Sequence, residues 1–156
     1  MHPTSHDLPK ASRAAMVALL NANLATTLDL ALQAKYAHWN VKGPSFIALH
    51  ELFDQVHTAA MTMADTMAER VTALGGTAGG TARIVAASSA LKEYRLKAAG
   101  GAEHVKALAA AIAGLAKPVR NAIDAAAQAG DAGTSDLFTG ASRELDKLLW
   151  LVEAHG

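Results

Sequence analysis

The segment from Lys35 to Gly76 constrains the fold more than any other part of the chain. From Ser45 onward, apolar side chains recur at intervals of three and four residues, which is the pattern of an amphipathic helix. Pro44 and Ser45 favour a helix start, and Gly75 and Gly76 favour its end. The segment therefore predicts one long helix with a buried stripe. The stripe consists of Leu49, Leu52, Phe53, Val56, Ala60, Met63, Met67 and Leu74.

A second face of this predicted helix carries side chains of the kind that bind metal ions. At roughly 100° per residue, two pairs with i, i+4 spacing fall together between about 100° and 200° from the apolar stripe. The pairs are His50 with Asp54 and Asp65 with Glu69. Each pair is close enough to grip one ion. Acids and a histidine on an exposed helix face are also ordinary, so spacing alone leaves a solvated face as the alternative.

One helix cannot bring the two pairs to a single ion. Asp54 and Asp65 are separated by about 16 Å of helix rise, whereas the ligands of one ion lie about 2 to 2.5 Å from it. Two copies packed antiparallel across a two-fold axis would set the His50 pair of one chain opposite the acidic pair of the other, which makes two equivalent sites. His38 joins this set, because a short hairpin returns the end of the preceding helix to His50. The mixed nitrogen and oxygen ligands suit iron, with zinc, cobalt and manganese as competitors.

Composition and periodicity predict an all-α fold. The chain is 51% hydrophobic and only 4% aromatic, which is typical of helical proteins. The remaining long helices are expected from about Ser12 to His38, over residues 101–129 and over residues 134–154. Pro118 should kink the third of the four long helices.

The connection between the second and third long helices predicts the topology. Residues 75–100 are glycine-rich at their start and near their end, and contain a short helix over about 81–88. Such a crossover joins two helices that run parallel, as in a ferritin-like four-helix bundle. We predict one bundle domain over residues 11–156, after a tail of residues 1–10 that its polarity and prolines predict to be disordered. The residues expected on or near the apolar face of the first helix are Met16, Leu19, Leu20, Leu24, Leu28, Ala31 and Leu32.

The charge balance argues against a dedicated nucleic-acid surface. Fourteen basic and fourteen acidic residues cancel, and neither half of the chain is a polycation. The absence of cysteine fits a cytoplasmic protein. No run of eighteen apolar residues and no charged-then-apolar leader is present, so we expect no membrane span and no signal peptide.

The motif around the predicted ligands closely resembles the Dps family (DNA-binding proteins from starved cells), which are ferritin-like miniferritins. Residues 90–94 and 141–147 also look like the family, so the resemblance covers nearly the whole chain. The residues that carry the motif are His38, Trp39, Asn40, Gly43, Phe46, Leu49, His50, Glu51, Asp54, Asp65, Thr66, Met67, Ala68, Glu69, Arg70, Leu74, Gly75 and Gly76.

This resemblance implies a ferroxidase that acts between subunits of a hollow dodecamer. Iron would be oxidised preferably by hydrogen peroxide, two ferrous ions per peroxide, and stored as a ferric mineral, which protects DNA from oxidative damage. No glutamate is followed three residues later by a histidine, so a di-iron site inside the bundle is not expected. The implied location is cytoplasmic, with nucleoid association. The ligands would be His38, His50 and Asp54 of one subunit with Asp65 and Glu69 of its two-fold partner.

Two residues near this site have competing interpretations. Trp39 is expected to anchor the turn by burying its ring, with electron donation near the metal as the alternative. Lys35 is expected to be solvated, with a contact between subunits as the alternative. Elsewhere in the chain, His104 is expected at the surface, at the start of the third long helix, rather than as a metal ligand.

Two acids at the start of the last long helix also have two interpretations. The resemblance implies that Asp131 and Asp136 line three-fold pores through which ferrous ions enter the shell. Helix capping and dipole complementarity explain Asp136 equally well and Asp131 better. The cap itself is expected from Thr134 or Ser135.

Two other functions compete with the ferroxidase. A DNA-compacting protein with incidental metal binding needs a basic tail, but the N-terminus offers only Lys10 and Arg13 against Asp7. A structural shell whose interface acids are bridged by zinc would bind zinc tightly without consuming peroxide.

Overall fold

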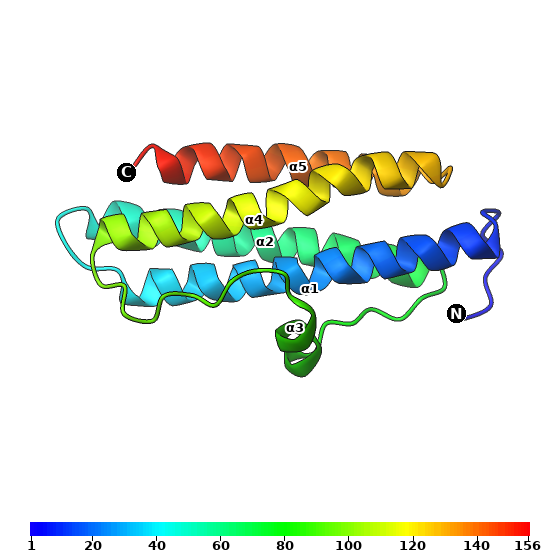
Figure 1. Cartoon of the computed structure of the whole chain (residues 1–156), viewed down its shortest axis with the longest axis horizontal. Coiled ribbons are helices and arrows are strands. Elements are labelled where there is room, and N and C mark those ends of the chain that lie inside the picture. The colour runs from blue at the N-terminus through cyan, green and yellow to red at the C-terminus, as the bar shows by residue number, and fades with distance from the viewer.

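The computed structural model describes all 156 residues and contains five helices (Figure 1). The predicted all-α bundle with a short helix in its crossover is confirmed. The helices are α1 (Lys10–Asn40), α2 (Phe46–Ala73), α3 (Ala82–Ser88), α4 (Gly101–Gln128) and α5 (Ala132–Glu153).

The bundle consists of two antiparallel helix pairs. α1 pairs with α2 and α4 pairs with α5, while α1 also contacts α4 and α2 contacts α5. Figure 1 shows α2 and α4 running in the same direction, so the chain must return along the bundle between them, and the segment with α3 makes this return. The parallel direction predicted for these two helices is therefore correct.

α2 presents the predicted stripe to the core. All eight stripe residues from Leu49 to Leu74 are buried. The helix ends as the glycines predict: the Gly75 N–H donates to the Thr72 carbonyl at 2.9 Å, and the Gly76 N–H donates to the Val71 carbonyl at 2.8 Å. This pattern needs a left-handed residue, and Gly75 has φ +83°. Ser45 stands at the start of α2, but its side chain makes no capping hydrogen bond.

α1 contributes a longer and less regular apolar face than predicted. Met16, Leu20, Leu24 and Ala31 are buried, whereas Leu32 is exposed, so its assignment to the core was wrong for the single chain. By length and hydropathy alone, α1 would also qualify as a membrane span. Half of the qualifying window is buried inside the bundle, as expected for a core helix.

The second helix pair differs from the prediction at its turn. Pro118 lies inside α4, and Figure 1 shows that this helix changes direction near its middle. The predicted cap of α5 was wrong: the cap is Asp131, whose carboxylate accepts the Thr134 N–H at 2.9 Å. Capping was the better of the two interpretations of Asp131, but the cap itself was assigned to Thr134 or Ser135.

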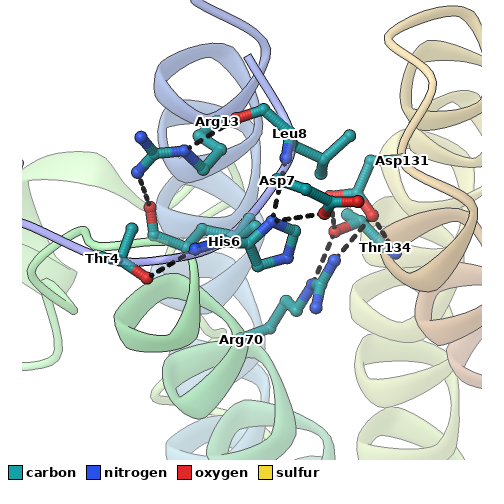
Figure 2. Close-up of polar contacts among 9 residues, drawn as sticks. Thr4, His6, Asp7, Leu8, Arg13, Arg70, Asp131 and Thr134 are labelled. Carbon is teal, nitrogen blue, oxygen red and sulfur yellow. Dashed lines mark hydrogen bonds and ion pairs between the residues drawn. The ribbon is translucent and has the colours of Figure 1, made fainter. Parts of the chain in front are cut away.

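Asp131 also ties α5 to the end of α2 (Figure 2). The Arg70 guanidinium donates to the Asp131 carboxylate at 2.6 Å and to the Thr134 hydroxyl at 3.0 Å. Burial alone would raise the pKa of Asp131, but the hydrogen bonds from Thr134 and the neighbouring Arg70 outweigh it and lower that pKa. The acid is therefore held charged within the bundle.

Residues 1–9 precede the first helix and contact the same end of the bundle. The His2 N–H donates to the Gly75 carbonyl at 2.6 Å. The Arg13 guanidinium donates to the carbonyls of Leu8 and Leu74, each at 3.1 Å (Figure 2). The disorder expected for residues 1–10 stays a prediction.

Candidate metal centre

The turn between α1 and α2 brings the two histidines together. α1 stops at Asn40, and Val41 is extended and buried. Gly43 then adopts φ +115°, a conformation that side chains rarely tolerate. The Phe46 N–H donates to the Gly43 carbonyl at 3.1 Å and begins α2. This tight reversal places the last turn of α1 beside the first turns of α2.

The ring of each histidine, His38 and His50, is held by the backbone carbonyl of the other. The His38 Nδ1 lies 2.7 Å from the His50 carbonyl oxygen, and the His50 Nδ1 lies 2.8 Å from the His38 carbonyl oxygen. Carbonyls only accept hydrogen bonds, so each Nδ1 carries its proton and each Nε2 keeps its lone pair. The rings stack with centroids 3.6 Å apart. Both side chains are thereby prepared as metal ligands through Nε2.

Asp54 lies one helical turn beyond His50 and is paired with Lys35. The Lys35 ammonium donates a hydrogen bond to the Asp54 carboxylate. This hydrogen bond is the main reason that the pKa of Asp54 is lowered, and the charge of Lys35 acts in the same direction. The expectation of a freely solvated Lys35 was therefore wrong.

The side chains of His38, His50 and Asp54 border an open hollow of about 540 Å³. Two of the three predicted ligands on this side come from α2 and one from α1. The hollow is lined by His38, His50, Glu51, Asp54, Gln55, Thr58 and Ala59.

The other two predicted ligands lie elsewhere on the surface of the subunit. Asp65 and Glu69 are exposed on α2 and do not line this hollow. Within one chain, no three His, Asp or Glu residues converge closely enough to hold a metal ion. The structure thus brings three of the five predicted ligands to one hollow and leaves the remaining two on a separate part of the same helix.

The comparisons with known proteins identify the family. The model of the ferritin-like domain matches residues 17–155. A DNA protection during starvation protein from Agrobacterium fabrum is 46% identical over 154 residues, which cover 99% of this chain and 95% of that protein. The chain belongs to the Dps family of ferritin-like proteins.

Solved Dps structures share the fold over almost their entire length. Dps from Mycobacterium smegmatis superposes with a TM-score of 0.93 at 31% identity and covers 98% of this chain and 93% of its own. Dps from Microbacterium arborescens, in its high iron form, superposes with a TM-score of 0.86 at 30% identity and covers 97% of both chains. The ferritin-like fold predicted from the crossover is thereby confirmed.

Two side chains of this Dps protein, Trp39 and His104, differ in burial from the sequence-based expectation. Trp39 is 68% exposed, so it does not anchor the turn by burial. His104 is completely buried and was wrongly expected at the surface. Its position could have been found, because His104 continues the spacing of buried Leu108, Ile112 and Leu115 along α4.

The two acids assigned to a Dps pore differ in environment. Asp131 is only 2% exposed and is engaged by Arg70 and Thr134, as its alternative interpretation anticipated. Asp136 is exposed and borders a surface hollow formed by the α4–α5 turn and the start of α5. Asp136 is therefore the acid that remains free to meet a cation at this end of the bundle.

Proposed function

We propose that this Dps protein is an iron-storage ferroxidase whose oxidation site is shared between two subunits. Iron would be bound by the His38, His50 and Asp54 side of one subunit together with Asp65 and Glu69 of its two-fold partner. The observation that carries this proposal is the pair of histidines with Nε2 prepared for a metal, beside a carboxylate, in a hollow that no further ligand of the same chain completes.

The ligand set fits the substrate. Imidazole nitrogens and carboxylate oxygens suit ferrous iron, and carboxylates favour the ferric product because their negative charge stabilises the higher cation. In the proposed reaction, each of two ferrous ions gives one electron. Hydrogen peroxide accepts both electrons with two protons, its O–O bond breaks, and two waters leave.

Lys35 would regulate access to the carboxylate. Its ammonium occupies the Asp54 oxygen in the subunit, so an incoming cation must displace it. Both partners are partly exposed, with side-chain exposures of 26% for Lys35 and 45% for Asp54. A pair this exposed is worth only about 0–1 kcal/mol, so a divalent ion can displace the lysine easily.

The surface of the subunit supports assembly. Large apolar side chains remain exposed on α1, α2 and α3, for example Leu32, Met61 and Ile84. Uncovered apolar side chains on neighbouring elements favour contacts between subunits. We propose that the chains form the hollow dodecamer of the family, in the cytoplasm, and that Asp136 lines the route by which iron enters.

Ferrous oxidation tests the proposal. Wild type, a His50→Ala, Asp54→Ala double variant and a control variant, Glu153→Ala, at an exposed acid of α5 outside the hollow, should be mixed with ferrous iron and either peroxide or oxygen, while ferric absorbance and particle size are followed together. We expect rapid oxidation by peroxide in wild type and the control, and slow oxidation by an intact double-variant shell. Equal, slow oxidation in all three proteins would leave a structural shell as the function. Tight zinc binding without peroxide consumption would point the same way.

An Asp136→Asn variant tests the entry route separately. Its shell should oxidise iron at the same site but form mineral more slowly, because one carboxylate per chain is lost at the entrance. An unchanged rate of mineral formation would exclude Asp136 from the route.

A further inference from the structure

A buried tyrosine–histidine pair joins the crossover to the start of α4, outside the hollow of the candidate metal centre. The Tyr94 hydroxyl, from the crossover, lies 2.8 Å from the Nδ1 of His104, near the start of α4. Tyr94 is 9% exposed and His104 is completely buried. Neither residue contributes to the hollow of the metal centre.

His104 is placed to accept the phenolic proton. Burial disfavours the charged ring and lowers the pKa of His104, so the ring is neutral at neutral pH. In the tautomer that carries its hydrogen on Nε2, Nδ1 accepts the hydrogen bond from the Tyr94 hydroxyl. Once charged, the ring would be favoured by the neighbouring Glu103 carboxylate and by the carbonyls of Asn40 and Ala98. Its Nε2 makes no hydrogen bond of normal geometry in the neutral state. Proton transfer from the phenol therefore leads to a state for which the surroundings already provide partners.

Burial also isolates the Tyr94 phenol from any other proton acceptor. Burial raises the pKa of Tyr94, so the phenol does not ionise by itself. A buried phenol that loses an electron releases its proton to a bonded base, because an unpaired charge is costly in a buried site. His104 is the only hydrogen-bond partner of this hydroxyl.

The second tyrosine of the chain provides the contrast. The chain contains only two tyrosines, and their rings pack edge to face with centroids 5.1 Å apart. The Tyr36 hydroxyl donates to the Leu96 carbonyl at 3.0 Å, and a carbonyl is not a base that takes up a proton. The Tyr94 hydroxyl is therefore hydrogen-bonded to a side chain that can take up its proton, whereas the Tyr36 hydroxyl is not.

Aromatic rings lie between the pair and the two helix segments that carry the predicted ligands. On one side, the His104 ring lies 6.4 Å from the ring of Phe53, the neighbour of Asp54 in α2. On the other, Tyr94 packs on Tyr36, two residues before His38 in α1. The phenol is therefore separated from the ligand-bearing segments by one aromatic side chain on one side and two on the other.

We propose that Tyr94 is a redox-active tyrosine with His104 as its proton acceptor, and that it supplies the second electron when peroxide meets a site holding a single ferrous ion. This inference rests on the proposed ferroxidase. The ferrous ion gives one electron and Tyr94 gives the other, the phenolic proton moves to His104 Nδ1, and peroxide takes both electrons and two protons from water to leave as two waters. A second ferrous ion then returns an electron to the phenoxyl radical, and His104 returns the proton. No hydroxyl radical is released.

Rapid freeze-quench electron paramagnetic resonance tests this assignment in the assembled protein. One ferrous ion per site is mixed with excess peroxide, and ring-deuterated tyrosine distinguishes a tyrosyl radical from a tryptophan radical. Wild type and Tyr36→Phe should give the tyrosyl signal, and Tyr94→Phe should lose it. His104→Gln, which keeps a hydrogen-bonding group but no base, should lose most of the signal.

Ferric absorbance in the same samples separates the two proposals. Ferric formation without a tyrosyl signal in wild type would overturn the role of Tyr94 and leave the ferroxidase standing. A signal that survives in Tyr94→Phe, or disappears in Tyr36→Phe, would do the same. No ferric formation by peroxide would overturn both proposals.

Discussion

Lys35 and Asp54 form an ion pair at the edge of the stacked histidines, so one proposed iron ligand is already engaged by a cation of its own chain. The pair links α1 to α2 beside the hollow. A divalent ion that binds the Asp54 carboxylate must therefore displace the Lys35 ammonium from it.

Replacing the competing cation should strengthen metal binding. Lys35→Met frees the Asp54 carboxylate, and we expect roughly 1.4- to fivefold tighter binding of zinc, which corresponds to the range of about 0.2–1 kcal/mol for an exposed pair. Isothermal titration calorimetry of the assembled protein measures this change. The matched control is Lys42→Met, which replaces an exposed lysine that lies in the turn between α1 and α2 and forms no ion pair. This variant should bind zinc like wild type. Unchanged affinity in Lys35→Met would show that the ion pair does not compete.

Removing the buried carboxylate at the start of α5 should destabilise the subunit. Asp131→Asn leaves Arg70 without its partner, and we expect a loss of about 3 kcal/mol, the lower end for a broken buried pair, because asparagine can still cap the helix. Asp136→Asn is exposed and should change stability by less than about 0.5 kcal/mol. Thermal unfolding at fixed protein concentration compares them. Equal midpoints for the two variants would contradict the buried ion pair.

The same carboxylate predicts an acid dependence of stability. The pKa of Asp131 is lower in the folded chain than in the unfolded chain, so its charge stabilises the fold above the ordinary pKa of aspartate, about 3.9. This contribution is lost as the pH falls through the lowered pKa. Thermal midpoints measured from pH 6 downward should therefore fall less steeply below about pH 4 in Asp131→Asn than in wild type. Parallel curves would contradict this assignment.

Alanine substitutions at two glycines that end helices distinguish the effect of backbone strain from the effect of contact with the N-terminal segment. Gly75 and Gly130 have φ values of +83° and +78°, and alanine at either position should cost about 1–2 kcal/mol. At Gly75 an added Cβ would also lie 2.8 Å from the His2 carbonyl oxygen, whereas at Gly130 it would meet nothing within 4 Å. Gly75→Ala should therefore speed proteolysis of residues 1–9, and Gly130→Ala should not. Equal proteolysis would show that the segment does not rest on Gly75 in solution.

DNA binding should be weak at physiological salt. The segment before α1 contains no lysine or arginine, and the Arg13 guanidinium donates to two carbonyls. Affinity for duplex DNA needs several phosphate contacts. A gel shift at roughly 0.15 M salt should be absent for wild type and present for a Thr4→Lys, Ser5→Lys, Asp7→Lys variant. A wild-type shift that persists at this salt concentration would revive the DNA-compacting function.

The sequence predicted the parts of the structure that depend on helical period. The stripe from Leu49 to Leu74 and the stop at Gly75 follow from local spacing and backbone preference, and both are confirmed. The stacking of His38 on His50 was foreseen as proximity only, since its reciprocal hydrogen bonds depend on the exact turn.

The features that the sequence did not predict depend on tertiary partners. Lys35 and Asp54 are nineteen residues apart in the chain and meet only because α1 packs on α2. Arg70 reaches Asp131 only because α5 starts beside the end of α2. Trp39 and Leu32 are apolar yet exposed in the subunit, because an apolar pattern does not distinguish a core from a surface that another subunit covers.

Mixed assembly tests the shared site most directly. One variant carries His50→Ala with Asp54→Ala, and the other carries Asp65→Ala with Glu69→Ala. Each alone should form shells that oxidise iron slowly. Unfolded together and reassembled, half of the two-fold pairs combine one chain of each kind and regain one complete site, so about a quarter of the wild-type peroxide-driven oxidation should return. Mixed shells of normal size that stay as inactive as the separate variants would contradict a site shared between subunits.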